Sequence, residues 1–256
     1  MAGRYTELLS PVTSQAIGPL LDAAGVGARM RVLDVGTGPG EAAAGAVARG
    51  ADATGIDVAP AMVDIAAERH PEAQFVQGSV TELPFADGSF DVGVGNIVIQ
   101  HVSEPERAAR ELARVLVPGG RVALSTWDVP ERSPIFGALL GAVADAAVPP
   151  PDQVPDGPSF FQFAEDDVFR ALLVNARFAD VEVTSFTFEF PVDSADELIN
   201  VVAEGTVRMG ALLRMADDSQ RARMRESVEL RIAPWRRGDR YLVPAPVKIA
   251  AGTKPG

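Results

Sequence analysis

The sequence contains no cysteine. Disulfides, thiolate metal sites and cysteine nucleophiles are therefore excluded, and nothing in the chain requires an oxidising compartment. Histidine is scarce as well, because His70 and His101 are the only imidazoles. They are too few for a histidine-rich zinc site, and carboxylates that could hold magnesium or calcium are the remaining alternative. We predict that the protein binds no metal ion.

The chain also lacks a long apolar run. Its N-terminus has no uninterrupted apolar core of the kind that signal peptides contain, and no later stretch is long and apolar enough to span a bilayer. The most apolar segment, Phe136 to Val148, is interrupted by Asp145 and leads into prolines, which favours a packed helix. We therefore expect a cytoplasmic protein that does not bind a membrane.

Positive charge is in the minority. The chain has 23 Lys and Arg residues against 35 Asp and Glu residues, and its formal net charge is -12. Nucleic-acid binding needs clustered cations that neutralise phosphates, so DNA and RNA are poor candidates for partners. Arginine is nevertheless dense in the C-terminal part, where it could receive an anionic substrate or form a solvated helix face paired with nearby acids such as Asp217 and Glu226. These arginines are Arg208, Arg214, Arg221, Arg223, Arg225, Arg231, Arg236, Arg237 and Arg240.

The length and the order of apolar segments indicate an α/β protein. A chain of 256 residues with 47% hydrophobic residues can bury a substantial core, so we expect a single domain with insertions. From Arg31 to Trp127, short runs rich in Val, Ile and Phe alternate with Ala- and Glu-rich stretches at helical spacing, a pattern typical of βαβ units and a parallel sheet. Residues 1–30 are expected to form a helical segment. Predicted strands occupy residues 31–35, 53–57, 73–77, 90–96 and 121–127.

Local signals predict several helix boundaries. Gly50 is expected to close the first helix after the first strand, and Pro60 fits the first turn of the second. Ser103 with Glu106 can form a capping box at the start of a third helix. The triplet Pro118-Gly119-Gly120 is expected to break that helix and to turn the chain into the next strand.

The second half of the chain has a different rhythm. Prolines and a glycine between Val148 and Ser159 predict a loop, which precedes a helix over residues 165–176 and a strand over 181–190. Helices are expected from Ser194, which can form a capping box with Glu197, and over residues 217–232. A final strand over 241–250 could only be an edge strand, because its two prolines lack N–H donors. Segments 128–176 and 193–238 are candidates for a lid over a substrate.

A glycine loop, Gly36-Thr37-Gly38-Pro39-Gly40, lies between the first predicted strand and the first helix. Glycines let a backbone approach a ligand closely. The spacing departs from the dinucleotide pattern G-x-G-x-x-G, because position 41 is Glu41, whose carboxylate would also repel a pyrophosphate. Asp57, at the end of the second strand, could accept hydrogen bonds from both hydroxyls of a ribose or could merely cap the next turn. The loop and Asp57 together predict a nucleotide-type site.

Four motifs follow one another along the first half of the chain. They are Val32-Leu33-Asp34-Val35-Gly36-Thr37-Gly38-Pro39-Gly40, Gly55-Ile56-Asp57, Leu83-Pro84-Phe85 and Arg114-Val115-Leu116-Val117-Pro118-Gly119-Gly120. In this order and spacing they resemble class I S-adenosylmethionine-dependent methyltransferases, in particular the small-molecule group that includes the ubiquinone- and menaquinone-biosynthesis enzymes. The resemblance covers about Arg31 to Trp127. It implies a Rossmann-like fold with a mostly parallel seven-stranded sheet, helices on both faces and an antiparallel last strand. It also implies a small-molecule acceptor and S-adenosylmethionine as cofactor, beside which Glu41 is tolerable because the cofactor has no phosphate.

The resemblance further implies which residues hold the cofactor. Aspartates would contact the methionine end or the loop and the ribose, and two apolar residues would pack on the adenine or would equally serve the core. Ser79 stands where the family usually has an aspartate, so either its hydroxyl or the backbone of Val80 would meet the adenine amino group. Asn96 would face the methionine moiety. The implied cofactor-binding set is Asp34, Gly36, Thr37, Gly38, Gly40, Asp57, Val58, Met62, Ser79, Val80 and Asn96.

Methyl transfer is an in-line displacement that needs no protein nucleophile, and it needs a base only if the acceptor must lose a proton. His101, just beyond the fourth strand, is the candidate for that catalytic base, although a hydrogen bond to a neighbouring loop is the simpler account of it. Two other functions remain as alternatives: an NAD(P)-dependent oxidoreductase, and a non-catalytic binding protein that retains the fold. The oligomeric state, the acceptor and the atom that receives the methyl group stay open.

Overall fold

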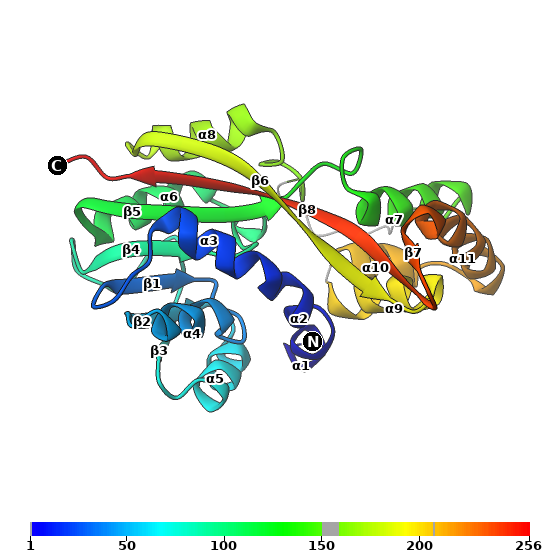
Figure 1. Ribbon diagram of the computed structural model, residues 1–256, viewed down its shortest axis with the longest axis horizontal. Coiled ribbons are helices and arrows are strands. Elements are labelled where there is room, and N and C mark those ends of the chain that lie inside the picture. Colours follow the sequence, from blue (N-terminus) through cyan, green and yellow to red (C-terminus); the bar gives the residue numbers. More distant parts are fainter. Residues whose placement is uncertain (1, 150–158, 207) are drawn as a thin grey trace. The chain divides into compact units, whose positions relative to one another are not determined.

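The computed structural model describes residues 2–149, 159–206 and 208–256 (Figure 1). Contacts divide the chain into two compact units. The sheet unit comprises residues 13–127, 158–186 and 247–256, and the helical unit comprises residues 1–12, 128–157 and 187–246. Most of the predicted proline-rich loop lies outside the described residues.

The sheet unit contains the predicted βαβ pattern. Its strands alternate with helices up to β5, and its last two strands continue into the helical unit along the chain. Its elements are η1 (Ser14–Ala16), α3 (Ile17–Ala24), β1 (Arg31–Val35), α4 (Glu41–Ala48), β2 (Asp52–Asp57), α5 (Pro60–Arg69), β3 (Gln74–Gln77), β4 (Phe90–Gly95), η2 (Ile99–His101), α6 (Pro105–Val115), β5 (Leu116–Trp127), α8 (Asp166–Asn175), β6 (Ala179–Val192) and β8 (Arg240–Thr253).

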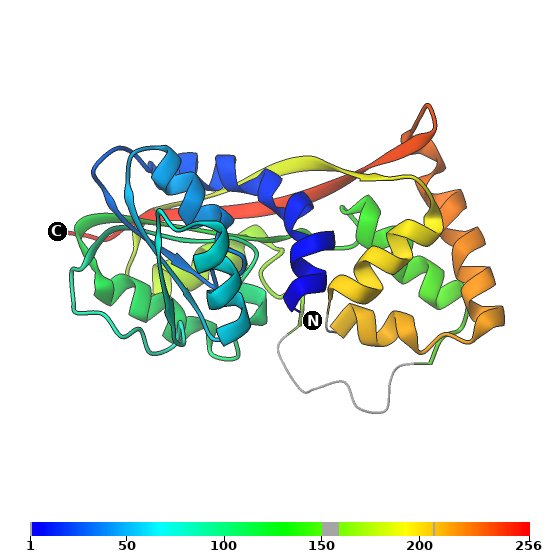
Figure 2. The same cartoon turned by 90° about the horizontal axis from the view of Figure 1, so that it is seen from below.

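The helical unit is built mainly of helices that contact one another, α11 against α7 and α9 against α1 and α10. Figure 2 shows β7 and β8 as a hairpin at its edge. The elements are α1 (Ala2–Leu8), α2 (Ser10–Thr13, which ends in the sheet unit), α7 (Pro134–Asp145), α9 (Ala195–Gly205), α10 (Arg208–Arg214), α11 (Asp218–Ile232), η3 (Ala233–Trp235) and β7 (Arg236–Arg237). No helix among the described residues has the length and apolarity to cross a bilayer.

The sheet has the strand order β3-β2-β1-β4-β5-β8-β6, and the two-residue β7 pairs with β8. The first five strands of this path pair in parallel, whereas β8 runs antiparallel to β5. The predicted seven-stranded, mostly parallel sheet with an antiparallel end is therefore confirmed, and β7 is an addition to it.

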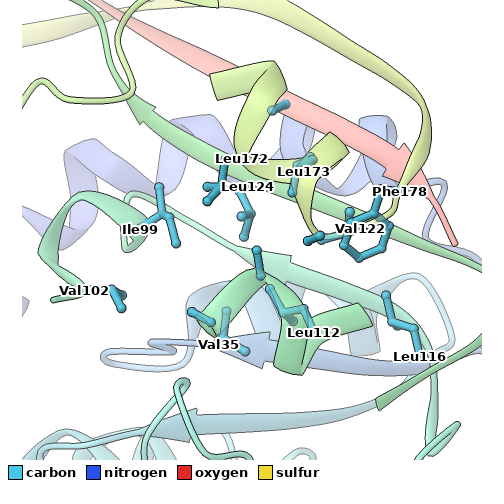
Figure 3. Packing of buried hydrophobic residues seen from close by; sticks show 14 of the residues in the cluster. Val35, Ile99, Val102, Leu112, Leu116, Val122, Leu124, Leu172, Leu173 and Phe178 are labelled. Atoms are coloured by element: carbon cyan, nitrogen blue, oxygen red, sulfur yellow. The ribbon is translucent and has the colours of Figure 1, made fainter. Parts of the chain in front are cut away.

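Neighbouring residues on the inner strands face opposite sides of the sheet. Val122 and Leu124 of β5 belong to the cluster formed with α6 and α8, whereas Ala123 between them packs with α3 and α4. Figure 3 shows the first of these clusters, in which Leu112 of α6 points toward the sheet. Because both faces are covered, the inner strands are mostly apolar rather than alternating, which is why the sequence pattern located them well.

Two predicted details of the third helix were wrong. Helix α6 begins at Pro105 after Glu104, and Ser103 makes no cap, because the proline already fits the first helical position. The helix ends at Val115, so Pro118-Gly119-Gly120 lies inside β5. The β4 to β5 register shifts between Phe90 and Val92, where the chain accommodates this triplet. Gly50, with a φ of 83° just after α4, and Pro60 at the start of α5 match their predicted roles.

The prediction that the last strand lies at an edge was also wrong, because β8 lies between β5 and β6. The residues of β8 that pair with β5 run from Val247 to Thr253, so Pro244 and Pro246 lie beyond the end of β5. The carbonyl of Pro246 accepts a hydrogen bond from the amide of Asp128 at 3.2 Å. In an antiparallel strand the N–H and C=O of one residue point the same way, so the missing donors face the side where β5 has ended.

Two arginines of α11 pair with acids of other helices, beside the attraction between Arg223 and the expected Asp217. Arg231 lies 3.0 Å from Asp145 on α7, and Arg225 lies 3.4 Å from Asp196 on α9. These pairs join different helices of the helical unit rather than residues of one helix face. Two of the arginines of α11 are therefore compensated by acids on other helices of this unit.

We predict that Leu112→Ala destabilises the sheet unit by about 2–5 kcal/mol, because Leu112 is fully buried and its loss leaves a cavity under the sheet. Val174→Ala is the matched control, since Val174 on α8 is 50% exposed and its change should fall within about 0.5 kcal/mol. Denaturant unfolding followed by circular dichroism measures both free energies. Equal, small changes would contradict the packing described for α6.

Candidate functional site

The glycine loop joins β1 to α4 in a conformation that side chains resist. Gly36, Gly38 and Gly40 have φ values of 62°, 53° and 93°. A Cβ on Gly36 would lie 2.1 Å from a methyl of Val98, so this glycine is required by close packing. A Cβ on Gly38 would meet nothing within 4 Å. The loop is therefore held tightly at Gly36 and faces open space at Gly38, where a ligand could approach the backbone.

Asp34, near the end of β1, fixes the glycine loop through hydrogen bonds. Its carboxylate is buried and accepts hydrogen bonds from the hydroxyl of Thr37 at 2.6 Å and from the amide of Ala43 at 3.2 Å. Burial raises the pKa of Asp34 to about 7, against the two hydrogen bonds that lower it, and the negative charges of Asp57 and Glu41 raise it further. Asp34 therefore ties the end of β1 to both the loop and the first turn of α4.

Asp57, on the neighbouring strand β2, also fixes the glycine loop. At the end of β2, it accepts hydrogen bonds from the amide of Gly38 at 3.0 Å and from the amide of Ala59 at 2.9 Å. The amide of Thr37 also donates to the carbonyl of Ile56 at 3.0 Å. Asp57 thus caps the next turn, which is one of its two predicted roles. Each carboxylate oxygen also keeps a further lone pair that could accept a hydrogen bond from a ligand hydroxyl, as the other role requires.

The two apolar residues predicted to pack on the adenine differ in burial. Val58 is 71% exposed, so it does not serve the core, which was the alternative role considered for it. Met62, in the first turn of α5, is half-buried. An exposed valine that directly follows Asp57 is available to a flat apolar ligand next to the loop.

Ser79 is engaged within its own turn. Its hydroxyl lies 2.8 Å from that of Thr81 and accepts a hydrogen bond from the Thr81 amide at 3.2 Å, while Ser79 also pairs with Glu82. Val80 is half-buried and packs against the cluster beneath α6. The Ser79 hydroxyl is thus partly occupied by Thr81. Of the two expected adenine contacts, this favours the backbone of Val80.

Asn96 is held by groups of the protein itself. Its amide nitrogen donates to the carbonyl of Thr13 at 3.1 Å, and its oxygen accepts from the hydroxyl of Ser125 at 2.8 Å. Both ends of the side chain therefore fasten the end of β4 to α2 and β5. This arrangement gives Asn96 a positioning role for the residue that follows it.

Ile97 is the strained residue of the site, and sequence reasoning missed it. Its φ is 52°, a left-handed conformation that is rare for a β-branched residue. Its amide donates to Ser125 at 2.8 Å, and its carbonyl accepts from the buried side chain of Gln100 at 3.0 Å. No signal in the sequence marks an isoleucine for such a conformation, because the conformation comes from partners 3 and 28 positions away.

His101 ends η2 at the carboxyl end of β4 and is exposed. Its ring meets Phe160 edge to face, with centroids 5.6 Å apart, and its Nε2 lies 3.5 Å from the amide nitrogen of Gln100. Phe160 in turn meets Phe161 at 5.0 Å. These aromatic residues, which the sequence prediction did not include, give His101 an apolar neighbour within the sheet unit.

Comparison with known proteins places this geometry in a family. A family model described as a methyltransferase domain matches residues 33–124. Among curated relatives, a demethylmenaquinone methyltransferase of Beutenbergia cavernae is 34% identical over 149 residues, 58% of this chain and 62% of that protein. Another, of Chlorobaculum parvum, is 30% identical over 171 residues, 62% of this chain and 70% of that protein. The chain belongs to the class I S-adenosylmethionine-dependent methyltransferases.

A solved structure has a similar fold at lower sequence identity. The crystal structure of the YcgJ protein from Bacillus subtilis superposes with a TM-score of 0.58 at 21% identity, covering 94% of this chain and 99% of that one. The match to the Beutenbergia relative spans less than two thirds of that protein's length. The family model ends before α7, so its match lies within the sheet unit.

Two family motifs are joined by one arginine of α6. The side chain of Arg114 donates to the carbonyls of Leu83 and Phe85 at 2.9 and 2.7 Å and pairs with Glu111 at 2.8 Å. Glu111 accepts from the amide of Leu83 at 2.8 Å, and its hydrogen bond with Arg114 lowers the pKa of the carboxyl. The methyltransferase motifs that begin at Leu83 and Arg114 thus form a single clamp that holds the loop after β3 on α6.

We predict that wild-type stability, relative to Asp34→Asn, falls as the pH rises from about 4 to about 7 and is constant above that range. A raised pKa in the folded state means that the unfolded chain loses its proton first, so ionisation opposes folding within this window. The expected fall is on the order of a few kcal/mol. Urea unfolding of both proteins over this pH range measures it, and a difference independent of pH would show that Asp34 stays ionised throughout.

Proposed function

We propose that the chain transfers a methyl group from S-adenosylmethionine to a small-molecule acceptor. The observation that supports this most is the Asp57 carboxylate, which holds the amide of Gly38 at 3.0 Å beside the open space at that glycine. A carboxylate in this place can bind ribose hydroxyls while the bare backbone admits the rest of the ligand. The family relationship supports the same cofactor.

The residues present fit S-adenosylmethionine. Asp57 would hold the ribose, with the exposed Val58 and half-buried Met62 against the adenine and the Val80 backbone at its amino group. Gly36 and Gly38 would let the methionine part pass along the loop. When bound, the cofactor would supply a methyl group on a sulfonium: the acceptor would bond to the methyl carbon in line with the C–S bond, and the sulfur would leave as the neutral thioether.

Two positioned elements would align the methionine part. Asp34 holds the loop through Thr37 and Ala43, so its role is in the shape of the loop rather than in direct contact. Asn96 and Ser125 hold Ile97 in its strained conformation at the end of β4. We propose that this strain positions the Ile97 carbonyl, whose second lone pair remains beside the hydrogen bond from Gln100, to accept a hydrogen bond from the methionine moiety in place of the Asn96 side chain.

The acceptor side would be formed by His101 and Phe160. The aromatic ring suits an apolar, planar acceptor, and the imidazole could remove a proton from a hydroxyl or an acidic carbon. Demethylmenaquinone, in the names of the relatives, has this apolar aromatic character. The predicted lid segments that lie in the helical unit remain candidates for acceptor specificity.

The oxidoreductase alternative is disfavoured by Glu41. It opens α4 as its first acidic residue and pairs with Arg69 at 3.0 Å, so a carboxylate occupies the helix start where a pyrophosphate would bind. A non-catalytic protein with the same fold would still bind the cofactor. Binding and turnover therefore require separate measurements.

We predict that S-adenosylmethionine and S-adenosylhomocysteine raise the melting temperature, whereas NAD does not. Ligand at 100 times its Kd would stabilise the folded state by about 2.7 kcal/mol. Gly38→Ala should lose this stabilisation, because its methyl group fills the open space beside the loop. Gly88→Ala is the matched control, since Gly88 has a similar φ of 67° with its nearest neighbour at 3.9 Å. Stabilisation by NAD alone would refute the proposal.

For turnover, we predict that His101→Ala lowers kcat about 100-fold or more with little change in cofactor affinity, if His101 is the base for this acceptor. Added imidazole should partly restore the rate of the alanine variant and leave the wild type unchanged. His101→Gln keeps hydrogen bonding but cannot act as the base, so it should stay slow. S-adenosylhomocysteine formation with a demethylmenaquinone analogue measures the rate, and near-normal turnover of either variant would remove His101 as the base.

A further inference from the structure

A basic pocket lies in the sheet unit between α6 and α8. It is an open cleft of about 510 Å³, and its lining includes Arg110, Arg114, Arg177 and Lys254 but no acidic residue. The two helices cover the same face of the sheet (Figure 1). Four cations around one cavity are unexpected in a chain whose net charge is -12.

The basic pocket is remote from the glycine loop. Helix α6 ends at Val115, just before β5 begins, and the amide of Lys254 donates to the carbonyl of Gly120 near the start of β5 at 2.8 Å. The pocket therefore lies at the edge where the parallel strands begin, whereas the glycine loop follows the end of β1. A ligand here would not share the cofactor site.

The four cations differ in how far they are compensated. Arg114 pairs with Glu111 and Asp87, and Lys254 donates to the carbonyl of Leu116 at 2.6 Å. Across the described part of the chain, by contrast, the exposed guanidinium groups of Arg110 and Arg177 have no hydrogen bond or ion pair. The pocket thus keeps two free guanidinium groups beside two fixed cations.

Helix capping does not account for these two arginines. Arg177 follows α8 with a φ of 69°, a position where glycine is common. The carbonyls of Val174 and Leu173 are already satisfied, because the amides of Arg177 and Phe178 donate to them at 2.9 and 3.1 Å. Arg110 lies in the middle of α6, one turn after Glu106 and one turn before Arg114, and no ion pair among the described residues fixes its guanidinium.

We propose that the basic pocket binds a small phosphate-bearing molecule. A guanidinium presents a planar fork of donors that matches phosphate oxygens in pairs, and here two such groups are free to turn toward one ligand. The volume is in the range of pockets that hold small molecules. The site is separate from the cofactor loop, so this binding stands independently of the proposed methyl transfer.

The test titrates the full chain with inorganic pyrophosphate by calorimetry at low ionic strength. Wild type should show saturable binding that weakens with added salt, and Arg110→Gln and Arg177→Gln should each weaken it about 10-fold, since each removes a charge-assisted contact. Arg107→Gln is the matched control. It removes the same charge from the same helix, pairs with Glu82 and Glu104 at 3.8 and 3.7 Å, and does not line the pocket.

Four results would overturn the proposal. Absence of saturable pyrophosphate binding to the wild type would do so directly. An equal loss in Arg107→Gln would mean that general charge attracts the anion, and competition by S-adenosylhomocysteine would place the probe in the cofactor site. A lower melting temperature of the pocket variants with unchanged pyrophosphate affinity would mean that the arginines stabilise the helices.

Discussion

The loop between β1 and α4 depends on two buried or half-buried carboxylates that accept hydrogen bonds from it. Asp34 receives the Thr37 hydroxyl and the Ala43 amide, and Asp57 receives the Gly38 amide from the neighbouring strand. Carboxylates that accept several such bonds pin a glycine-rich backbone that has little side-chain packing of its own. The open space at Gly38 exists because the loop is held from these two sides.

The strands of the sheet unit could be predicted closely because strands that are buried on both faces require runs of apolar residues, and glycine and proline separate these runs. β1 has its predicted bounds, and β2 begins one residue earlier than predicted. β8 could not be placed, because whether Pro244 and Pro246 disturb a sheet depends on where β5 ends. Such information lies in a partner strand and not in the segment itself.

The candidate site divides in the same way. The glycine loop, Asp34 and Asp57 are close together as the motif spacing implied, since parallel strands bring their carboxyl ends to one edge. Asn96 and Ser79 are at strand ends too, yet their side chains bond to Thr13, Ser125 and Thr81. The sequence can show that a polar residue lies near a site. Whether its side chain bonds to a ligand or to other protein groups depends on which residues the fold brings next to it.

The interleaving of the two units has a consequence for synthesis on the ribosome. The helical unit needs residues from 1–12 and from as late as 246, and the sheet unit is completed by residues 247–256. One edge of β5 therefore remains unpaired until residues Val247 to Thr253 of β8 have left the ribosomal exit tunnel. A nascent chain that stalls before this point exposes a long apolar strand edge, the kind of surface that chaperones must cover to prevent aggregation.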